Sequence, residues 1–171
     1  MKRWALFLVM LISVAVLLVP MAQAAEEHAG RLVQHNLKVE SKEVGDVPGH
    51  IKGVVESCGL IFFSKGPSSG EISTTTATTQ FDVVNGKGTF TAERVNTYPD
   101  GSTLSLKVVG IQAPVDGGKR TAFEGSYEFA GGTGSHAGKE GKGTFKGERI
   151  GSPATGGDAY FDFTGTEWKK Q

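Results

Sequence analysis

The chain after residue 24 consists of runs of β-forming residues that alternate with turn signals. No long stretch of this part carries the apolar spacing of a helix. Runs rich in Val, Ile, Thr and Phe are instead separated by clusters of Gly, Pro, Asn, Asp and Ser, which favour turns. The pattern predicts eight strands, over residues 31–40, 50–63, 71–84, 89–98, 103–112, 120–129, 143–150 and 158–168.

Short turns connect most of these strands. Asn85-Gly86 is a strong hairpin signal, because both positions of such a turn take a positive φ. Pro99-Asp100-Gly101-Ser102 and Asp116-Gly117-Gly118 are further turns. An even number of neighbouring antiparallel strands can close on itself, and about eight strands enclose a lumen that is either packed or holds one small molecule. We therefore expect an all-β, eight-stranded antiparallel β-barrel; a two-sheet sandwich is the alternative that strand spacing leaves open.

The first residues have the features of a cleavable signal peptide. The basic pair Lys2-Arg3 precedes an apolar run, Trp4–Val19, and a small-x-small site ends at Ala24, which predicts a mature start at Ala25. The alternative is an uncleaved anchor, but the apolar run is shorter than the roughly 20 residues of a spanning helix and is closed by Pro20. We expect a secreted or periplasmic protein without a stable membrane anchor after cleavage.

The predicted division of the chain is a signal peptide over 1–24, a flexible mature N-terminus over 25–30 and a barrel domain over 31–168.

Net charge and cysteine content limit the partners and the covalent links that we expect. Without the signal, 16 basic residues face 18 acidic ones, so the net charge is near −2 and a nucleic-acid partner is not expected. Cys58 is the single cysteine, so no internal disulfide forms.

A short motif occurs twice. Gly-Lys-Gly-Thr-Phe stands at 86–90 and again at 141–145, and each copy is followed by Glu-Arg, at Glu93-Arg94 and Glu148-Arg149. Because neighbouring residues of a strand point to opposite faces, one member of each Glu-Arg pair must point into the barrel unless a bulge intervenes. For each Glu-Arg pair, we favour surface exposure, or a structural ion pair between an inward Arg and an inward Glu, over a catalytic role.

The segment 50–63 offers the candidate site. Strict alternation places Glu56, Cys58 and Phe62 on one face, and a carboxylate in an apolar lumen is a candidate acid, base or charge stabiliser because desolvation disfavours its charged form. The opposite face of this segment is apolar too, so the choice between the faces stays open. With Tyr98 as a further aromatic lining, the candidate ligand-binding residues are Glu56, Cys58, Phe62 and Tyr98, and Glu56 is the weak catalytic candidate.

The sequence offers little support for a metal site, a nucleotide-binding loop or a hydrolase active site. The glycine-rich stretch 131–143 lacks a Walker lysine pattern, and no Gly-x-Ser-x-Gly elbow occurs. His35 and His50 could meet on adjacent strands, but a metal site would need a third ligand. His28 is expected in the flexible N-terminus and His136 in solvent. We expect neither a metal nor a cofactor.

Three segments carry a family resemblance: His50–Leu60, the turn Tyr98–Ser102 and the glycine-rich run from Gly132 to Phe145. Together they resemble secreted bacterial proteins of the allene oxide cyclase barrel-like class, whose architecture plant allene oxide cyclases and dirigent proteins share. The resemblance spans about 31–168. It implies a calycin-like eight-stranded barrel, often a homotrimer, with an apolar lumen open at one end.

The functional expectation combines the residues and the resemblance. We expect an exported barrel that binds a small apolar or aromatic molecule in its lumen, either without turnover or as a cofactor-independent cyclase or isomerase. The alternative is a non-enzymatic structural or interaction module with a filled core and an apolar patch on its outer wall.

Overall fold

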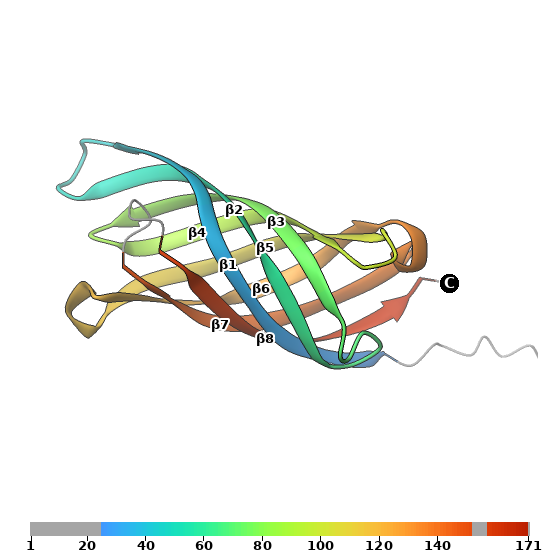
Figure 1. Cartoon of the computed structure of the whole chain (residues 1–171). Coiled ribbons are helices and arrows are strands. Elements are labelled where there is room, and N and C mark those ends of the chain that lie inside the picture. The colour runs from blue at the N-terminus through green and yellow to red at the C-terminus, as the bar shows by residue number, and fades with distance from the viewer. Residues whose placement is uncertain (1–24, 152–156, 171) are drawn as a thin grey trace, which may run out of the picture.

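The computed structural model describes residues 25–151 and 157–170, which form one closed antiparallel barrel (Figure 1). Each strand pairs with the next along the chain, and the first pairs with the last. This confirms the eight-stranded barrel over the sandwich alternative. The strands are β1 (Glu26–Glu43), β2 (His50–Lys65), β3 (Ile72–Val84), β4 (Lys87–Thr97), β5 (Thr103–Val115), β6 (Arg120–Gly132), β7 (Lys139–Ile150) and β8 (Ala159–Lys169). Two short 3₁₀ helices, η1 (Asp116–Gly118) and η2 (Gly134–His136), lie in the connections.

The barrel begins earlier than expected. Residues Glu26–Gly30, expected to be a flexible N-terminus, belong to β1 and pair with β8 in a register that runs from Glu26 opposite Glu167 to Gln34 opposite Ala159. This pairing closes the sheet, which is why the segment is ordered. The predicted signal peptide lies outside the described residues. In the described part of the chain, no helix has the length and apolar character needed to cross a membrane.

The predicted turns have the expected backbone. Asn85 and Gly86, between β3 and β4, take φ values of 51° and 78°. Gly101 takes φ 80°, and the Tyr98 amide donates to the Ser102 carbonyl oxygen at 2.9 Å, which closes the β4–β5 hairpin. Turn chemistry that is readable in the sequence therefore sets the connections between these strands.

Aromatic rings lie over inward-facing glycines of neighbouring strands. A Cβ placed at Gly53, Gly110 or Gly125 would stand 2.5–2.7 Å from a ring atom, so no larger residue fits there. Glycine at such positions lets a strand bend sharply, and the ring fills the space that the missing side chain leaves. The cross-strand pairs are Gly30–Phe163, Gly53–Phe81, Gly110–Phe90, Gly125–Phe145, Gly143–Tyr127 and Gly147–Phe161.

Side chains close the barrel end at which β1 begins. The Tyr98 ring stacks on His136 with 3.8 Å between ring centroids, and both are buried. Asp100 accepts hydrogen bonds from the Ser102 amide at 2.9 Å and the Ser135 hydroxyl at 2.9 Å, which ties the two turns together. Hydrogen bonds from Ser102 and Ser135 lower the pKa of Asp100 to about 2. The expectation of a solvent-exposed His136 is wrong, because η2 folds it against Tyr98.

Replacing Gly125 with Val should destabilise the barrel by about 3 kcal/mol, because the new side chain meets the Val109 carbonyl oxygen and the Phe145 ring. Urea unfolding followed by circular dichroism measures this. Glu124→Ala, on the exposed face one residue away, is the control and should change stability by less than about 0.5 kcal/mol. Equal stability of the two variants would contradict ring-on-glycine packing.

Candidate functional site

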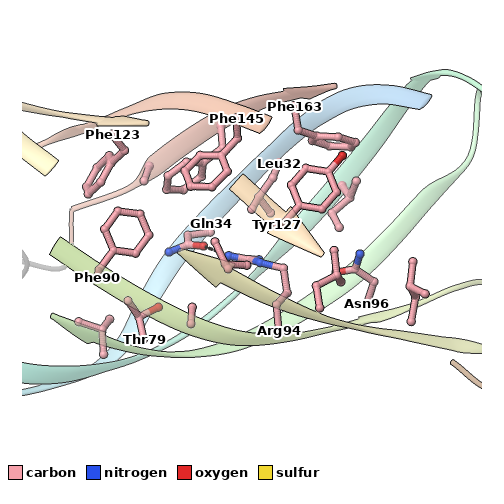
Figure 2. A pocket seen from close by; sticks show the side chains of 18 of the residues that line it. Leu32, Gln34, Thr79, Phe90, Arg94, Asn96, Phe123, Tyr127, Phe145 and Phe163 are labelled. Atoms are coloured by element: carbon pink, nitrogen blue, oxygen red, sulfur yellow. Dashed lines mark hydrogen bonds between the residues drawn. The ribbon is translucent and has the colours of Figure 1, made fainter. Parts of the chain in front are cut away.

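A cavity of about 130 Å³ lies in the lumen and is lined by side chains from all eight strands (Figure 2). Most of the lining is aromatic or aliphatic, and a few polar groups stand among it. The apolar part includes Leu32, Val55, Ile61, Phe63, Phe81, Phe90, Phe123, Phe145, Phe161 and Phe163. The polar part comprises His28, Gln34, Asn36, Thr79, Arg94, Asn96, Gln112, Arg149 and Glu167, together with the tyrosines Tyr98 and Tyr127.

Strand alternation places the central polar group. In β4 the residues Phe90, Ala92, Arg94 and Asn96 line the cavity, while Glu93 between them is exposed. The period of two in an extended strand requires this division. The second copy of the repeated motif has the same arrangement in β7, where Phe145 and Arg149 line the same cavity.

Arg94 is a guanidinium in the middle of the lumen. Its Nη1 donates to Thr75 Oγ1 at 3.1 Å and its Nη2 donates to Gln34 Oε1 at 2.7 Å. The Thr75 hydroxyl in turn donates to Asn96 Oδ1 at 2.8 Å. Burial lowers the pKa of Arg94 to about 10, so the group still carries its charge at neutral pH.

Arg149 is a second guanidinium in the lumen; it is buried and lies at the opposite end of the lumen from His28. Its Nη2 donates to Thr121 Oγ1 at 3.2 Å, and its carbon Cζ lies 5.2 Å from the Phe123 ring centroid. Burial lowers its pKa to about 10. Within 25–151 and 157–170, no carboxylate forms a salt bridge with either Arg94 or Arg149.

The expected inward Glu partners are therefore not found. Glu93 is exposed, and Glu148 accepts a hydrogen bond from Arg120 at 2.6 Å. Both Glu-Arg pairs turn the arginine inward and the glutamate outward, so the expectation of surface exposure or an inward ion pair is wrong for the arginines. The arginines point inward because the Phe four residues earlier fills the lumen, and residues four apart share a strand face.

A second polar cluster lies near the closed end of the barrel. His28 Nε2 and the Tyr127 hydroxyl are 2.5 Å apart, and His28 Nδ1 is 3.7 Å from Glu167 Oε2. Lys139 Nζ donates to Glu167 Oε1 at 2.7 Å. Burial lowers the pKa of His28 and raises the pKa of Tyr127, which favours the neutral form of each. Lys139 balances Glu167, so the lumen keeps a positive charge.

The sequence-derived candidates divide between the two sides of the wall. Tyr98 lines the cavity, but Glu56 and Phe62 are exposed and Cys58 is half-buried outside it. The lumen receives the opposite face of β2, including Val55 and Ile61. The interpretation of Glu56, Cys58 and Phe62 as lumen residues is therefore wrong.

Both faces of β2 are apolar: one faces the lumen, and the other belongs to an apolar patch on the outer wall of the barrel. Val33 of β1 pairs with Leu60 of β2 and Tyr160 of β8, and Phe62 of β2 pairs with Ile72 of β3. These five side chains, here called the outer patch, are 38–50% exposed. Alternation alone could not distinguish this face from the lumen face.

Sequence reasoning did not identify Gln34, Asn36, His28 or Tyr127 as lumen residues, and it did not decide which member of the Glu93-Arg94 pair points inward. One signal could have decided for Arg94: Phe90 and Arg94 are four residues apart and therefore share a strand face, and Phe is more often buried than exposed. His28 was placed in a flexible N-terminus, yet it lies in β1 and is buried. That placement is wrong because β1 extends to Glu26.

The histidines do not converge on a metal site. His35 Nδ1 lies 2.7 Å from Asp158 Oδ1. His50 contacts Asp46 and Asp82 at 2.5 and 2.7 Å, and it begins β2, whereas His35 pairs with Cys58 in the middle of that strand. Among the residues with described positions, no three His, Cys, Asp or Glu side chains gather as metal ligands would.

Replacing Arg94 with Met should raise the unfolding free energy by about 1 kcal/mol. Burial shifts the pKa from 12.5 to about 10, which corresponds to an unfavourable contribution of about 3 kcal/mol, and the two lost hydrogen bonds offset about 2 kcal/mol of that gain. Urea unfolding at pH 7 measures the change. A loss of more than about 2 kcal/mol would show instead that Arg94 stabilises the fold.

Comparison with known protein families, curated proteins and solved structures finds no match to this chain. The likeness to allene oxide cyclase barrel-like proteins stays a hypothesis, and the eight-stranded antiparallel barrel is the established part of it. The function must therefore be argued from the lumen.

Proposed function

We propose that this barrel binds a small molecule with an apolar or aromatic body in its lumen. The observation that carries the proposal is a cavity of about 130 Å³ whose walls are mainly aromatic and aliphatic. An engineered apolar cavity of about 150 Å³ in another protein binds benzene, so this lumen suits a body of about one ring. Convergent polar groups within an apolar pocket are typical of ligand sites.

Export and turnover belong to the same proposal. The predicted signal peptide would place the binding protein in the periplasm or outside the cell. A cyclase or isomerase must move a proton and stabilise charge, and His28 with Tyr127 forms a neutral proton-transfer pair beside the cavity. Arg94 could stabilise a developing negative charge. These groups support a cofactor-independent isomerisation as the catalytic extension of binding.

The outer patch supports the second candidate function, a structural or interaction module. Five partly exposed apolar side chains on β1, β2, β3 and β8 form a continuous surface of the kind that mediates association. A homotrimer, which the family resemblance implies, would cover it. The two candidates are compatible, because the lumen and the outer patch lie on opposite sides of the wall.

Indole, a neutral aromatic probe, should bind the purified protein and shift the amide resonances of the lumen residues in an NMR titration. Ala92→Leu should weaken this binding at least tenfold, because Ala92 lines the cavity and the larger side chain occupies the space of the probe. Thr91→Leu, on the exposed face of the same strand, is the matched control and should leave the affinity unchanged. Shifts confined to the outer patch would contradict lumen binding.

A further inference from the structure

We propose that the molecule bound in the lumen carries a single anionic group, a carboxylate or a group of like shape and charge, and that Arg94 holds it. This inference rests on the proposed lumen binding and names the ligand class. The anion would sit in the middle of the lumen, and its apolar body would lie among the aromatic rings around it (Figure 2).

The arginines of this chain show a contrast that points to such a ligand. Of the four in the described ranges, the two exposed ones have carboxylate partners: Arg31 makes two hydrogen bonds to Asp162, at 2.6 and 2.7 Å, and Arg120 pairs with Glu148 at 2.6 Å. The two that line the lumen, the half-buried Arg94 and the buried Arg149, have none. Physical chemistry favours the reverse, because a buried charge is costly unless it is paired, whereas an exposed charge is solvated by water.

Arg94 keeps donors for a ligand. A guanidinium has five N–H groups, and Arg94 uses one on Nη1 for Thr75 and one on Nη2 for Gln34. The remaining N–H groups have no acceptor in the parts of the chain that the structure places. The planar fork of a guanidinium matches two carboxylate oxygens, which is why arginine recurs where carboxylates are recognised.

A second donor stands in the same lumen. Asn36 of β1 lines the cavity, and its side-chain nitrogen Nδ2 is buried without a hydrogen-bond acceptor among the described residues. In the cross-strand register, Asn36 lies opposite Ser57, Ser57 opposite Ala77, and Ala77 opposite Arg94, so Asn36 and Arg94 belong to one ring of inward positions. A buried amide donor without an acceptor is a cost that an anionic ligand would remove.

No acidic group among the described residues of the lumen forms a salt bridge with Arg94. The carboxylate lining the cavity is Glu167, which accepts from Lys139 at 2.7 Å and lies near His28. Its position near the closed end leaves the middle of the lumen positively charged. Arg149 donates from Nε to the Gly151 carbonyl oxygen and from Nη2 to Thr121, and it lies over the Phe123 ring at the end of the lumen. Arg94 lies in the middle of the lumen, among the aromatic rings, so it is the better placed of the two to bind an anion.

The cavity volume limits the rest of the ligand. A space of about 130 Å³ accommodates one ring or a short chain rather than a long acyl chain. Phe90, Phe123 and Phe145 lie to one side of Arg94, and Tyr127 and Phe163 lie above it (Figure 2). The fitting class is a small aromatic or short branched monocarboxylate.

The test compares benzoate with benzamide, a neutral molecule of nearly the same shape, by isothermal titration calorimetry at pH 7. We expect benzoate to bind at least tenfold more tightly than benzamide. In Arg94→Met this preference should fall to less than twofold while benzamide affinity stays within threefold, and Arg94→Lys should keep part of the preference. Arg31→Gln, which removes the same charge from the outer wall, should behave as wild type.

The outcomes separate the inference from the proposal on which it rests. Equal binding of benzoate and benzamide by the wild type overturns the anion site and leaves lumen binding standing. Absence of binding by indole, benzamide and benzoate alike overturns both. Circular dichroism of each variant verifies folding, and an Arg94→Met protein that is folded yet keeps the benzoate preference also overturns the inference.

A pH series identifies the residue that holds the anion. The titratable groups that line the lumen besides Arg94 are His28, Tyr98, Tyr127, Arg149 and Glu167. The benzoate preference should stay constant between pH 6 and 9, because burial leaves the Arg94 pKa at about 10, and should weaken above that value. A preference that is lost as the pH rises through the mildly acidic range would assign the anion to His28, because burial holds the His28 pKa below its usual value, and would overturn the assignment to Arg94.

Discussion

Ring-on-glycine packing is the interaction on which the barrel depends. A sheet of eight strands closes only if its strands bend and tilt, and glycines on the inner face permit this bending. Phe and Tyr side chains from neighbouring strands then cover the exposed backbone at these glycines, so the curvature and the apolar core come from the same pairs. The rings do not fill the lumen completely. The remaining cavity is therefore a consequence of how this barrel closes, and its aromatic lining follows from the same constraint.

The polar side chains of the lumen are exceptions within this mainly apolar lining. The inner face of a small barrel needs few polar residues for folding, and a guanidinium without a carboxylate partner opposes folding. Arg94 and Arg149 occupy equivalent positions in the repeated motif, four residues after a core Phe, yet neither has an acidic partner among the described residues. Sites that trade stability for binding show this kind of arrangement. The exposed arginines, in contrast, both have carboxylate partners.

The two ends of the barrel differ in chemistry. Near the start of β1, the Tyr98–His136 stack and the Asp100–Ser135 hydrogen bond join the β4–β5 and β6–β7 connections across the end of the lumen, and the Lys139–Glu167 pair links β7 to β8. At the other end, Arg149 and Gln112 line the cavity beside Phe123 and Phe161. A ligand entering from that end would meet a positive group first and would reach Arg94 after passing the aromatic rings. Fold alone does not decide whether such a ligand is stored or transformed, because closed barrels serve many chemistries.

The sequence by itself determined the strands, their turns and their antiparallel order, because strand period and turn chemistry act over a few residues. It also identified Tyr98 as part of the lining. Only the tertiary structure decided which face of β2 looks inward: alternation defines two faces, but where both are apolar, as around Glu56, the choice depends on packing against other strands. Arg94 and Gln34 show the same limit, since they are separated by 60 positions and meet only when the barrel closes. His28 and His136 are buried for a similar reason, since β8 and Tyr98 cover them from distant parts of the chain. Whether a charged side chain has a partner is a property of closure, and no local pattern contains it.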